Sequence, residues 1–149
     1  MYVYMRQEHV TLYGVEASQL YDKIRQYLKD QKLDIIHEEK EGNYRSLKAH
    51  KGTAGSVVIG NVRDVEVMMS GTEGNYELIL RTGAWGRDIL VPAAIAGALT
   101  AGLAAVPAAA VAGYRAHAFE KHFWDYIQKT LAEIGKGKAE MSEPVTVSP

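Results

Sequence analysis

The sequence predicts an α+β fold in which an antiparallel sheet of about five strands precedes an Ala/Gly-rich helical segment and a C-terminal amphipathic helix. Several short segments alternate large and polar residues, which is typical of strands, and two longer segments repeat apolar residues every three or four positions, which is typical of helices. The 149 residues suit one domain with an appendage.

The first half of the chain predicts the order β-α-β-β-β-β within a head that spans residues 1–86. Residues 1–13 alternate as a strand, and residues 16–32 form an amphipathic helix. The dipeptide Gly42-Asn43 predicts a tight turn between strands at 33–40 and 44–51. The apolar side of the predicted helix carries Ala17, Leu20, Ile24 and Leu28.

The last two strands of the head cover residues 62–69 and 76–82. Residues 51–61 fit either a glycine-rich loop or a short buried strand. In strand 62–69 the acidic Asp64 and Glu66 lie opposite the apolar side, and we expect solvent and Arg63 to satisfy them. The apolar sides of the two strands carry Val65, Val67, Met69, Tyr76, Leu78 and Leu80.

Residues 87–114 form the most distinctive segment, because no charged side chain occurs between Asp88 and Arg115. We call residues 89–113 the apolar run; 14 of its 25 residues are Ala or Gly. A helix that is apolar on all sides needs lipid, a protein core or a partner around it. Small residues recur at every fourth position and would form a groove for close helix packing: Ala93, Gly97, Ala101, Ala105, Ala109 and Gly113.

Three arrangements of the apolar run stay open. It is long enough for a single membrane crossing, although Pro107 would kink such a helix. A turn near residues 100–102 would instead give a helical hairpin with both ends at one level. The same hairpin could be buried in protein, usually within an oligomer. In either membrane arrangement, the interface residues would be Trp85, Arg87, Tyr114 and Arg115.

Residues 115–134 predict a second amphipathic helix, and residues 135–149 predict a disordered tail. The spacing of the aromatic residues in this helix indicates packing along a surface, either the sheet of the head or a bilayer interface, and the acidic polar face with Glu120, Asp125 and Glu133 favours the sheet. The apolar stripe comprises Phe119, Phe123, Ile127, Leu131 and Ile134, whereas Glu120, Lys121, Asp125, Lys129 and Glu133 are expected to face solvent.

Composition and motifs offer little chemistry. The formal net charge of −1 and the scattered basic residues do not favour nucleic-acid binding, and the lack of cysteine excludes thiol chemistry and disulfides. The N-terminus lacks the pattern of a cleaved export peptide. His117 and His122 are spaced poorly for a metal, and only His37 and Glu39 of the His37-Glu38-Glu39 cluster share a strand face. We therefore expect no catalytic residues, cofactor or metal site.

The order of features resembles small uncharacterised prokaryotic proteins that have an α+β head and a C-terminal hydrophobic helix. The features that carry this resemblance lie within residues 44–134: Trp85, Arg87 and Asp88, the apolar run, and Tyr114 and Arg115. The strand order of the head is also similar to TATA-binding-protein-like or helix-grip domains. The resemblance implies membrane association and no reaction, and it gives no support for DNA binding.

The sequence thus predicts a non-enzymatic accessory or scaffold protein. Its Ala/Gly-rich segment would insert into a membrane or drive self-assembly, with another copy or a partner membrane helix as the binding partner and the bilayer as a second partner. The head would lie on the cytoplasmic side of a membrane, or the chain would form a soluble cytoplasmic assembly. The alternative is a soluble small-molecule binder or enzyme with a pocket between the sheet and the C-terminal helix.

Overall fold

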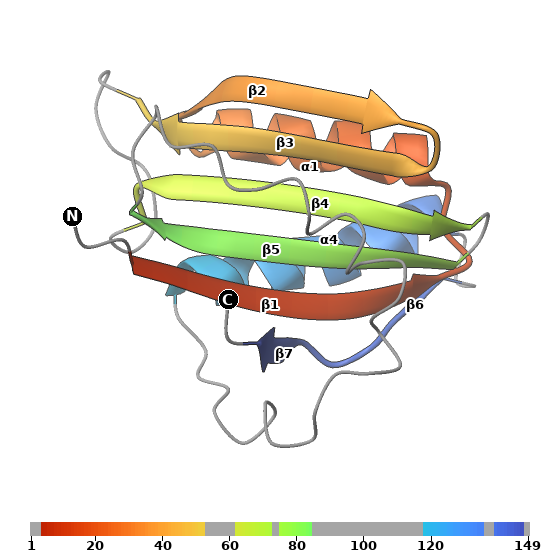
Figure 1. The fold of residues 1–149 in the computed structure, drawn as a ribbon. Helices are drawn as coiled ribbons and strands as arrows, with labels where there is room; N and C mark the ends of the chain where they lie inside the picture. Colours follow the sequence, from red (N-terminus) through yellow and green to blue (C-terminus); the bar gives the residue numbers. More distant parts are fainter. Residues whose placement is uncertain (1–3, 53–61, 73–74, 85–117, 136–138, 148–149) are drawn as a thin grey trace.

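The computed structural model describes residues 4–52, 62–72, 75–84, 118–135 and 139–147. The predicted α+β class is confirmed, because an antiparallel sheet carries both described helices on one face (Figure 1). The elements in chain order are β1 (Tyr4–Tyr13), α1 (Ala17–Asp30), β2 (Leu33–Glu41), β3 (Tyr44–Lys51), β4 (Asp64–Thr72), β5 (Asn75–Ala84), α4 (Ala118–Ile134), β6 (Glu140–Met141) and β7 (Val145–Val147).

The strands lie side by side in the order β2-β3-β4-β5-β1-β6, and β7 also pairs with β1. Every pairing is antiparallel. Consecutive hairpins therefore build β2 to β5, and β1 then closes against β5. Gly42 has a positive φ of 59° in the predicted two-residue turn between β2 and β3, a backbone conformation that glycine adopts without steric cost.

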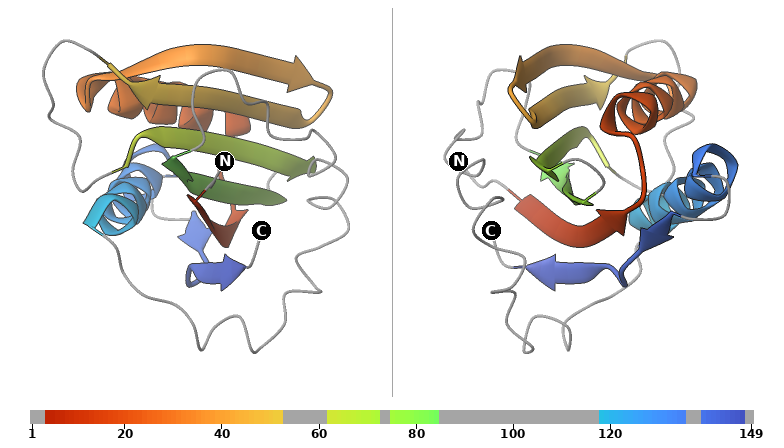
Figure 2. Two further views of the ribbon diagram at one scale, coloured as in Figure 1. Left: turned by 60° about the vertical axis from the view of Figure 1, so that its left-hand side comes forward. Right: turned by 90° about the vertical axis from the view of Figure 1, so that its right-hand side faces the viewer.

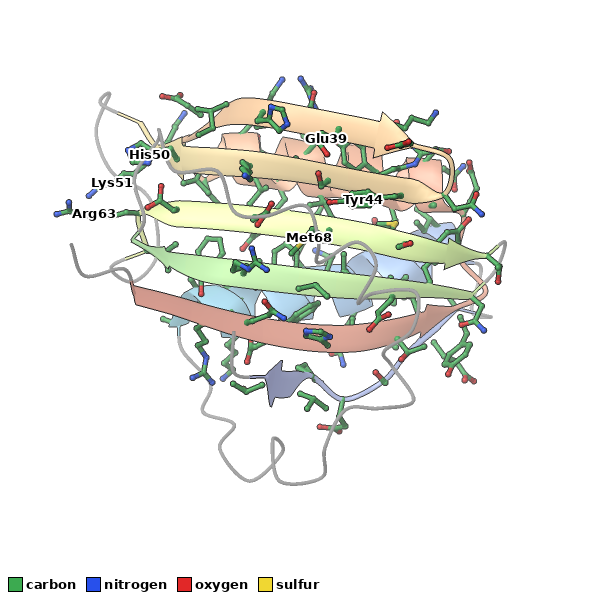
Figure 3. The ribbon with its side chains drawn as sticks, viewed as in Figure 1. Glu39, Tyr44, His50, Lys51, Arg63 and Met68 are labelled. Atoms are coloured by element: carbon green, nitrogen blue, oxygen red, sulfur yellow. The ribbon has the colours of Figure 1, made fainter. Side chains whose placement is uncertain are left out.

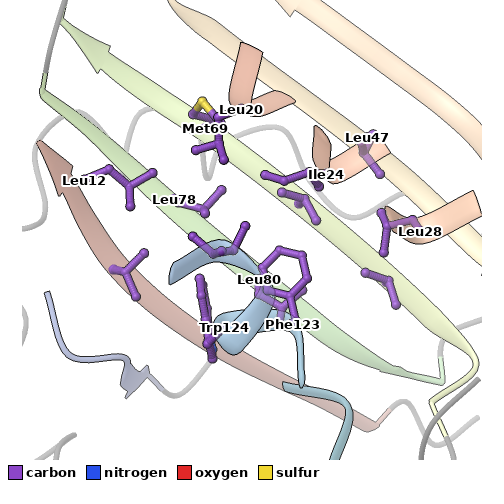
Figure 4. Packing of buried hydrophobic residues seen from close by; sticks show 14 of the residues in the cluster. Leu12, Leu20, Ile24, Leu28, Leu47, Met69, Leu78, Leu80, Phe123 and Trp124 are labelled. Carbon is purple, nitrogen blue, oxygen red and sulfur yellow. The ribbon is translucent and has the colours of Figure 1, made fainter. Parts of the chain in front are cut away.

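The main hydrophobic core lies between the sheet and the two helices (Figures 2 and 4). The predicted helix at 16–32 is observed as α1, and its four predicted apolar residues are all buried. The strand faces predicted to be apolar also point into this core. Each fully buried Leu, Ile or Phe side chain contributes about 1.5–3 kcal/mol. Residues that fill the centre of the core include Leu12, Leu20, Ile24, Leu28, Leu47, Met69, Leu78, Leu80, Phe123 and Trp124.

Helix α4 is attached to α1 as well as to the sheet. The ring of Tyr27 on α1 lies 6.0 Å from the ring of Phe123, edge to face, and 4.4 Å from the ring of Tyr126. The hydroxyl of Tyr126 donates a hydrogen bond of 3.1 Å to the backbone oxygen of Lys23. The second predicted helix thus packs on the head, the one of the two predicted surfaces that the sequence favoured.

The prediction of a disordered tail is wrong for β6 and β7. Both short strands pair with the outer edge of β1, and Arg6 donates a hydrogen bond of 3.2 Å to the hydroxyl of Thr146. Backbone N–H and C=O groups at a sheet edge can bind a strand that has almost no large apolar residue. Polar composition alone therefore did not reveal this pairing.

Candidate functional site at the end of the sheet

The end of β5 and the beginning of α4 lie at the same end of the sheet, which we call the root. Two residues before β5 ends, the hydroxyl of Thr82 donates a hydrogen bond of 2.8 Å to Oε1 of Glu120, which lies in the first turn of α4. Figure 1 shows the tip of β5 and the first turn of α4 at this end of the sheet. The described chain therefore stops at Ala84 and resumes at Ala118 at the same end of the sheet.

The predicted packing and interface residues all belong to the interval 85–117, outside the described part of the chain. Their arrangement thus stays a prediction. They are Ala93, Gly97, Ala101, Ala105, Ala109 and Gly113 for helix packing, and Trp85, Arg87, Tyr114 and Arg115 for the membrane interface. Among the described residues, no helix combines the length and apolar character that a bilayer crossing requires.

A buried polar cluster, formed by Arg6, Glu8, Thr82, Glu120 and Trp124, joins α4 to β1 and β5 at the root. The indole N–H of Trp124 donates to Oε1 of Glu8 at 2.9 Å. Arg6 lies between the two carboxylates, 3.7 Å from Oε2 of Glu8 and 3.8 Å from Oε1 of Glu120. The Oε2 atoms of Glu8 and Glu120 accept no hydrogen bond from the described residues. We call these five residues the root cluster.

The surroundings of Glu8 in the root cluster shift the pKa of its carboxyl upward. Burial raises the pKa of the Glu8 carboxyl, and the nearby carboxylate of Glu120 raises it further. The hydrogen bond from Trp124 and the charge of Arg6 act in the opposite direction but do not cancel the effect of burial. Two acidic groups thus share one arginine in a place that water does not reach.

The root cluster is suited to holding α4 and poorly suited to catalysis. Glu8 and Glu120 are 0% and 2% exposed, so a substrate cannot approach either carboxyl without displacing α4. Each of the two carboxyls accepts a hydrogen bond from a different element, one from α4 and one from β5. The cluster therefore fixes the position at which the chain re-enters the head.

The prediction that Glu120 faces solvent is wrong, and the predicted apolar stripe lacks Trp124, which is buried. Helix α4 buries an arc wider than one stripe because it contacts both α1 and the sheet. Its buried residues accordingly include the adjacent pairs 119–120, 123–124 and 130–131.

The sheet face that points away from the helices carries a row of buried charged groups, Lys48, Glu66 and Arg81, together with Gln7. These four residues lie directly opposite one another on β3, β4, β5 and β1. Nη1 of Arg81 donates to Oε1 of Glu66 at 2.8 Å, and its Nε and Nη2 donate to Oε1 of Gln7 at 3.2 and 3.0 Å. Nζ of Lys48 lies 3.9 Å from Oε2 of Glu66. Arg81 is only 1% exposed.

The charged row also determines which ring nitrogen of His9 accepts a hydrogen bond. Because Oε1 of Gln7 accepts from Arg81, the amide nitrogen of Gln7 donates to Nε2 of His9 at 2.8 Å. Neutral His9 then carries its proton on Nδ1, which faces Oε1 of Glu77 at 3.5 Å. The arrangement is a chain of interactions across three strands, with both nitrogens of His9 facing protein groups.

The prediction for Asp64 and Glu66 is wrong, because both carboxyls are buried and their partners are not Arg63. Nδ1 of His50 lies 2.6 Å from Oδ1 of Asp64, and Glu66 belongs to the charged row. The predicted proximity of His37 and Glu39 is confirmed at 2.9 Å on an exposed face. No group of three His, Asp or Glu side chains placed to hold a metal occurs in the described ranges.

No protein-family model and no curated protein matches this sequence. The resemblance to proteins with an α+β head and a hydrophobic helix therefore stays a prediction. The root, with its root cluster, is the candidate functional site, because the described residues that flank the interval 85–117 meet there.

Proposed function

We propose that the protein is a non-enzymatic accessory or scaffold protein whose apolar run inserts into a membrane as a hairpin, with the head on the cytoplasmic side. Self-assembly through the small-residue groove, or packing against a partner membrane helix, would accompany insertion. The hydrogen bond between Thr82 and Glu120 supports the proposal most directly, because it joins the last strand before the interval 85–117 to the first turn of the helix that follows it.

The position of α4 favours a hairpin over a single crossing. A single crossing would put α4 and the head on opposite sides of the bilayer. Helix α4, however, buries Phe119, Phe123 and Trp124 against the same head that the chain has just left. Moving α4 across the membrane would expose these three aromatic side chains and leave Glu8 without its hydrogen bond from Trp124.

Chain length supports the same geometry. Thirty-three residues separate Ala84 from Ala118. A helical crossing needs about 20 residues, so about 13 would have to return through the hydrocarbon without satisfying their backbone groups. Two arms of about a dozen residues each, turning near residues 100–102, reach about 18 Å at 1.5 Å per residue. One leaflet is about half of the roughly 30 Å hydrocarbon core, so a hairpin of this depth would occupy one leaflet and extend only slightly beyond its middle plane.

The alternative function, a small-molecule binder or enzyme with a pocket between sheet and C-terminal helix, has less support. Phe119, Phe123, Trp124 and Ile127 occupy that space and are at most 3% exposed. A hollow of about 540 Å³ lies instead between α1 and β2, with exposed charged residues such as Lys29 on its wall. This hollow lies away from the root cluster and from the charged row.

Fractionation of cells that produce the full chain tests the proposal. We expect the protein to stay in the membrane pellet after an alkaline wash and to require detergent for extraction. Its release by the wash as a monomer would overturn the proposal, whereas its release as a large homogeneous particle would leave only the self-assembly part.

Substitutions in the groove test the packing mode. Gly97→Leu or Ala101→Leu should reduce the particle size in mild detergent, because a bulky side chain keeps a second backbone out of contact distance. Leu99→Ile, outside the small-residue groove and nearly unchanged in volume, is the matched control. An unchanged particle size in both groove variants would mean that the groove has no role in assembly.

A further inference from the structure

Exposed cations gather at the root. Lys32 precedes β2, Lys51 ends β3 and Arg63 precedes β4, so the three come from neighbouring strands. The backbone N–H of Lys51 donates a hydrogen bond of 2.8 Å to the backbone oxygen of Arg63, and the N–H of the next residue, Gly52, donates one of 3.3 Å to the backbone oxygen of Lys32. Figure 3 shows Lys51 and Arg63 beside His50 at this end of the sheet. All three cations are exposed.

These cations lie at the same end of the sheet as the last residues of β5. The N–H of Arg63 donates a hydrogen bond of 3.2 Å to the backbone oxygen of Gly83, the residue before the end of β5. Because adjacent strands lie about 4.8 Å apart, Lys32, Lys51 and Arg63 span roughly 10 Å of the sheet end. We call these three residues the basic edge.

The charges that surround the basic edge leave it with a positive excess. The carboxylate of Asp64 is buried against His50, while exposed Asp30 ends α1 and exposed Asp34 lies on β2, so two exposed acids accompany the three exposed cations. The ion pairs of the described residues involve none of the three basic-edge cations. Exposed Lys121, in the first turn of α4, adds a further cation at the root.

The opposite end of the sheet carries charges of both signs. Glu41 lies at the turn between β2 and β3, Glu16 precedes α1, and Glu140 pairs with the last residue of β1; all three are exposed. Exposed Lys40 lies beside Glu41 and pairs with Arg45 across the same turn.

We infer that the basic edge binds the anionic headgroups of the leaflet that the apolar run enters. This inference rests on the proposed function, since a hairpin that starts at the root would bring the basic edge against the headgroups. Clustered lysine and arginine side chains next to a membrane-inserted segment gain about fivefold in binding per cation from an anionic surface.

Binding of the full chain to preformed vesicles tests the inference. The protein, diluted from mild detergent, is mixed with vesicles of phosphatidylcholine alone or of phosphatidylcholine and phosphatidylserine, and the lipid concentration for half-maximal flotation is measured. We expect tighter binding to the anionic vesicles. The triple variant Lys32→Gln/Lys51→Gln/Arg63→Gln should lose on the order of 100-fold of that binding, because each cation contributes about fivefold.

The matched control is Lys23→Gln/Lys40→Gln/Lys129→Gln, which removes three exposed cations elsewhere on the helices and on β2. It changes the net charge by the same amount and should retain tight binding to the anionic vesicles. In about 1 M salt, where the screening length falls to about 3 Å, the preference for anionic vesicles should vanish. Circular dichroism of each variant confirms that the head is folded.

The outcomes separate this inference from the proposed function. Equal binding of the unmodified protein to both vesicle types, with no effect of the triple variant, would overturn the inference and leave membrane insertion standing. Binding to neither vesicle would overturn both. Displacement from anionic vesicles by millimolar inorganic phosphate, or equally tight and salt-sensitive binding of an oligonucleotide, would show that the basic edge does not recognise a membrane surface.

Discussion

Replacing Phe123 by alanine would remove a fully buried aromatic side chain that attaches α4 to the head. Phe123 is 0% exposed, and its ring lies edge to face with Tyr27 at 6.0 Å and with Trp124 at 5.0 Å. Truncation of a buried phenylalanine costs about 3–5 kcal/mol. Each aromatic pair lost adds about 0.5–1.5 kcal/mol beyond buried area, which places the expected loss near the upper end of that range.

The assay is urea-induced unfolding of the full chain in mild detergent, followed by far-ultraviolet circular dichroism and by tryptophan fluorescence. A loss of about 4–5 kcal/mol is large against the roughly 5–15 kcal/mol that stabilises a typical domain, so the midpoint should fall steeply. Gln128→Ala, at an exposed position of the same helix, is the control and should change stability by at most about 0.5 kcal/mol. If Phe123→Ala costs no more than this control, α4 is not packed on the head, and the docking of α4 no longer supports the proposed hairpin.

Two further predictions concern the buried charges. Because the pKa of Glu8 is raised in the folded state, its contribution to stability is full at low pH and is lost as the pH rises through the raised pKa. The stability of Glu8→Gln, measured by thermal unfolding, should therefore increase relative to the unmodified protein as the pH rises towards neutrality. A stability difference that does not change with pH would contradict the raised pKa. Arg81→Met leaves buried Glu66 without its closest cation and should cost about 3–5 kcal/mol. Lys48→Met/Glu66→Leu/Arg81→Met removes all three charges of the row and should recover most of this loss in the same unfolding assay. A triple variant no more stable than Arg81→Met would refute the pairing.

The sequence predicted the elements of the head well because their patterns are local. The alternation of Val65, Val67 and Met69 has the period of a strand, and Leu20 and Ile24 have the spacing of a helix face. These patterns depend only on which side of each element meets the core. They therefore held without knowledge of the strand order.

The sequence predicted the partners of polar residues poorly because those partners come from distant strands. The contact between Glu66 and Arg81 requires the register of β4 against β5, and the contact between Glu120 and Thr82 requires knowing where α4 docks. Opposite charges at matching parity, as in Lys48, Glu66 and Arg81, were the available signal. This signal becomes usable only after the strand order is known.

Labelling single cysteines can show on which side of the membrane the head and α4 lie, since the chain contains no cysteine of its own. Glu41→Cys lies on the head and Gln128→Cys on α4, both at exposed positions. In sealed membrane vesicles, we predict that a membrane-impermeant maleimide modifies both cysteines from the same side. Modification of one from each side would contradict the closure of the chain at the root and, with it, the proposed hairpin.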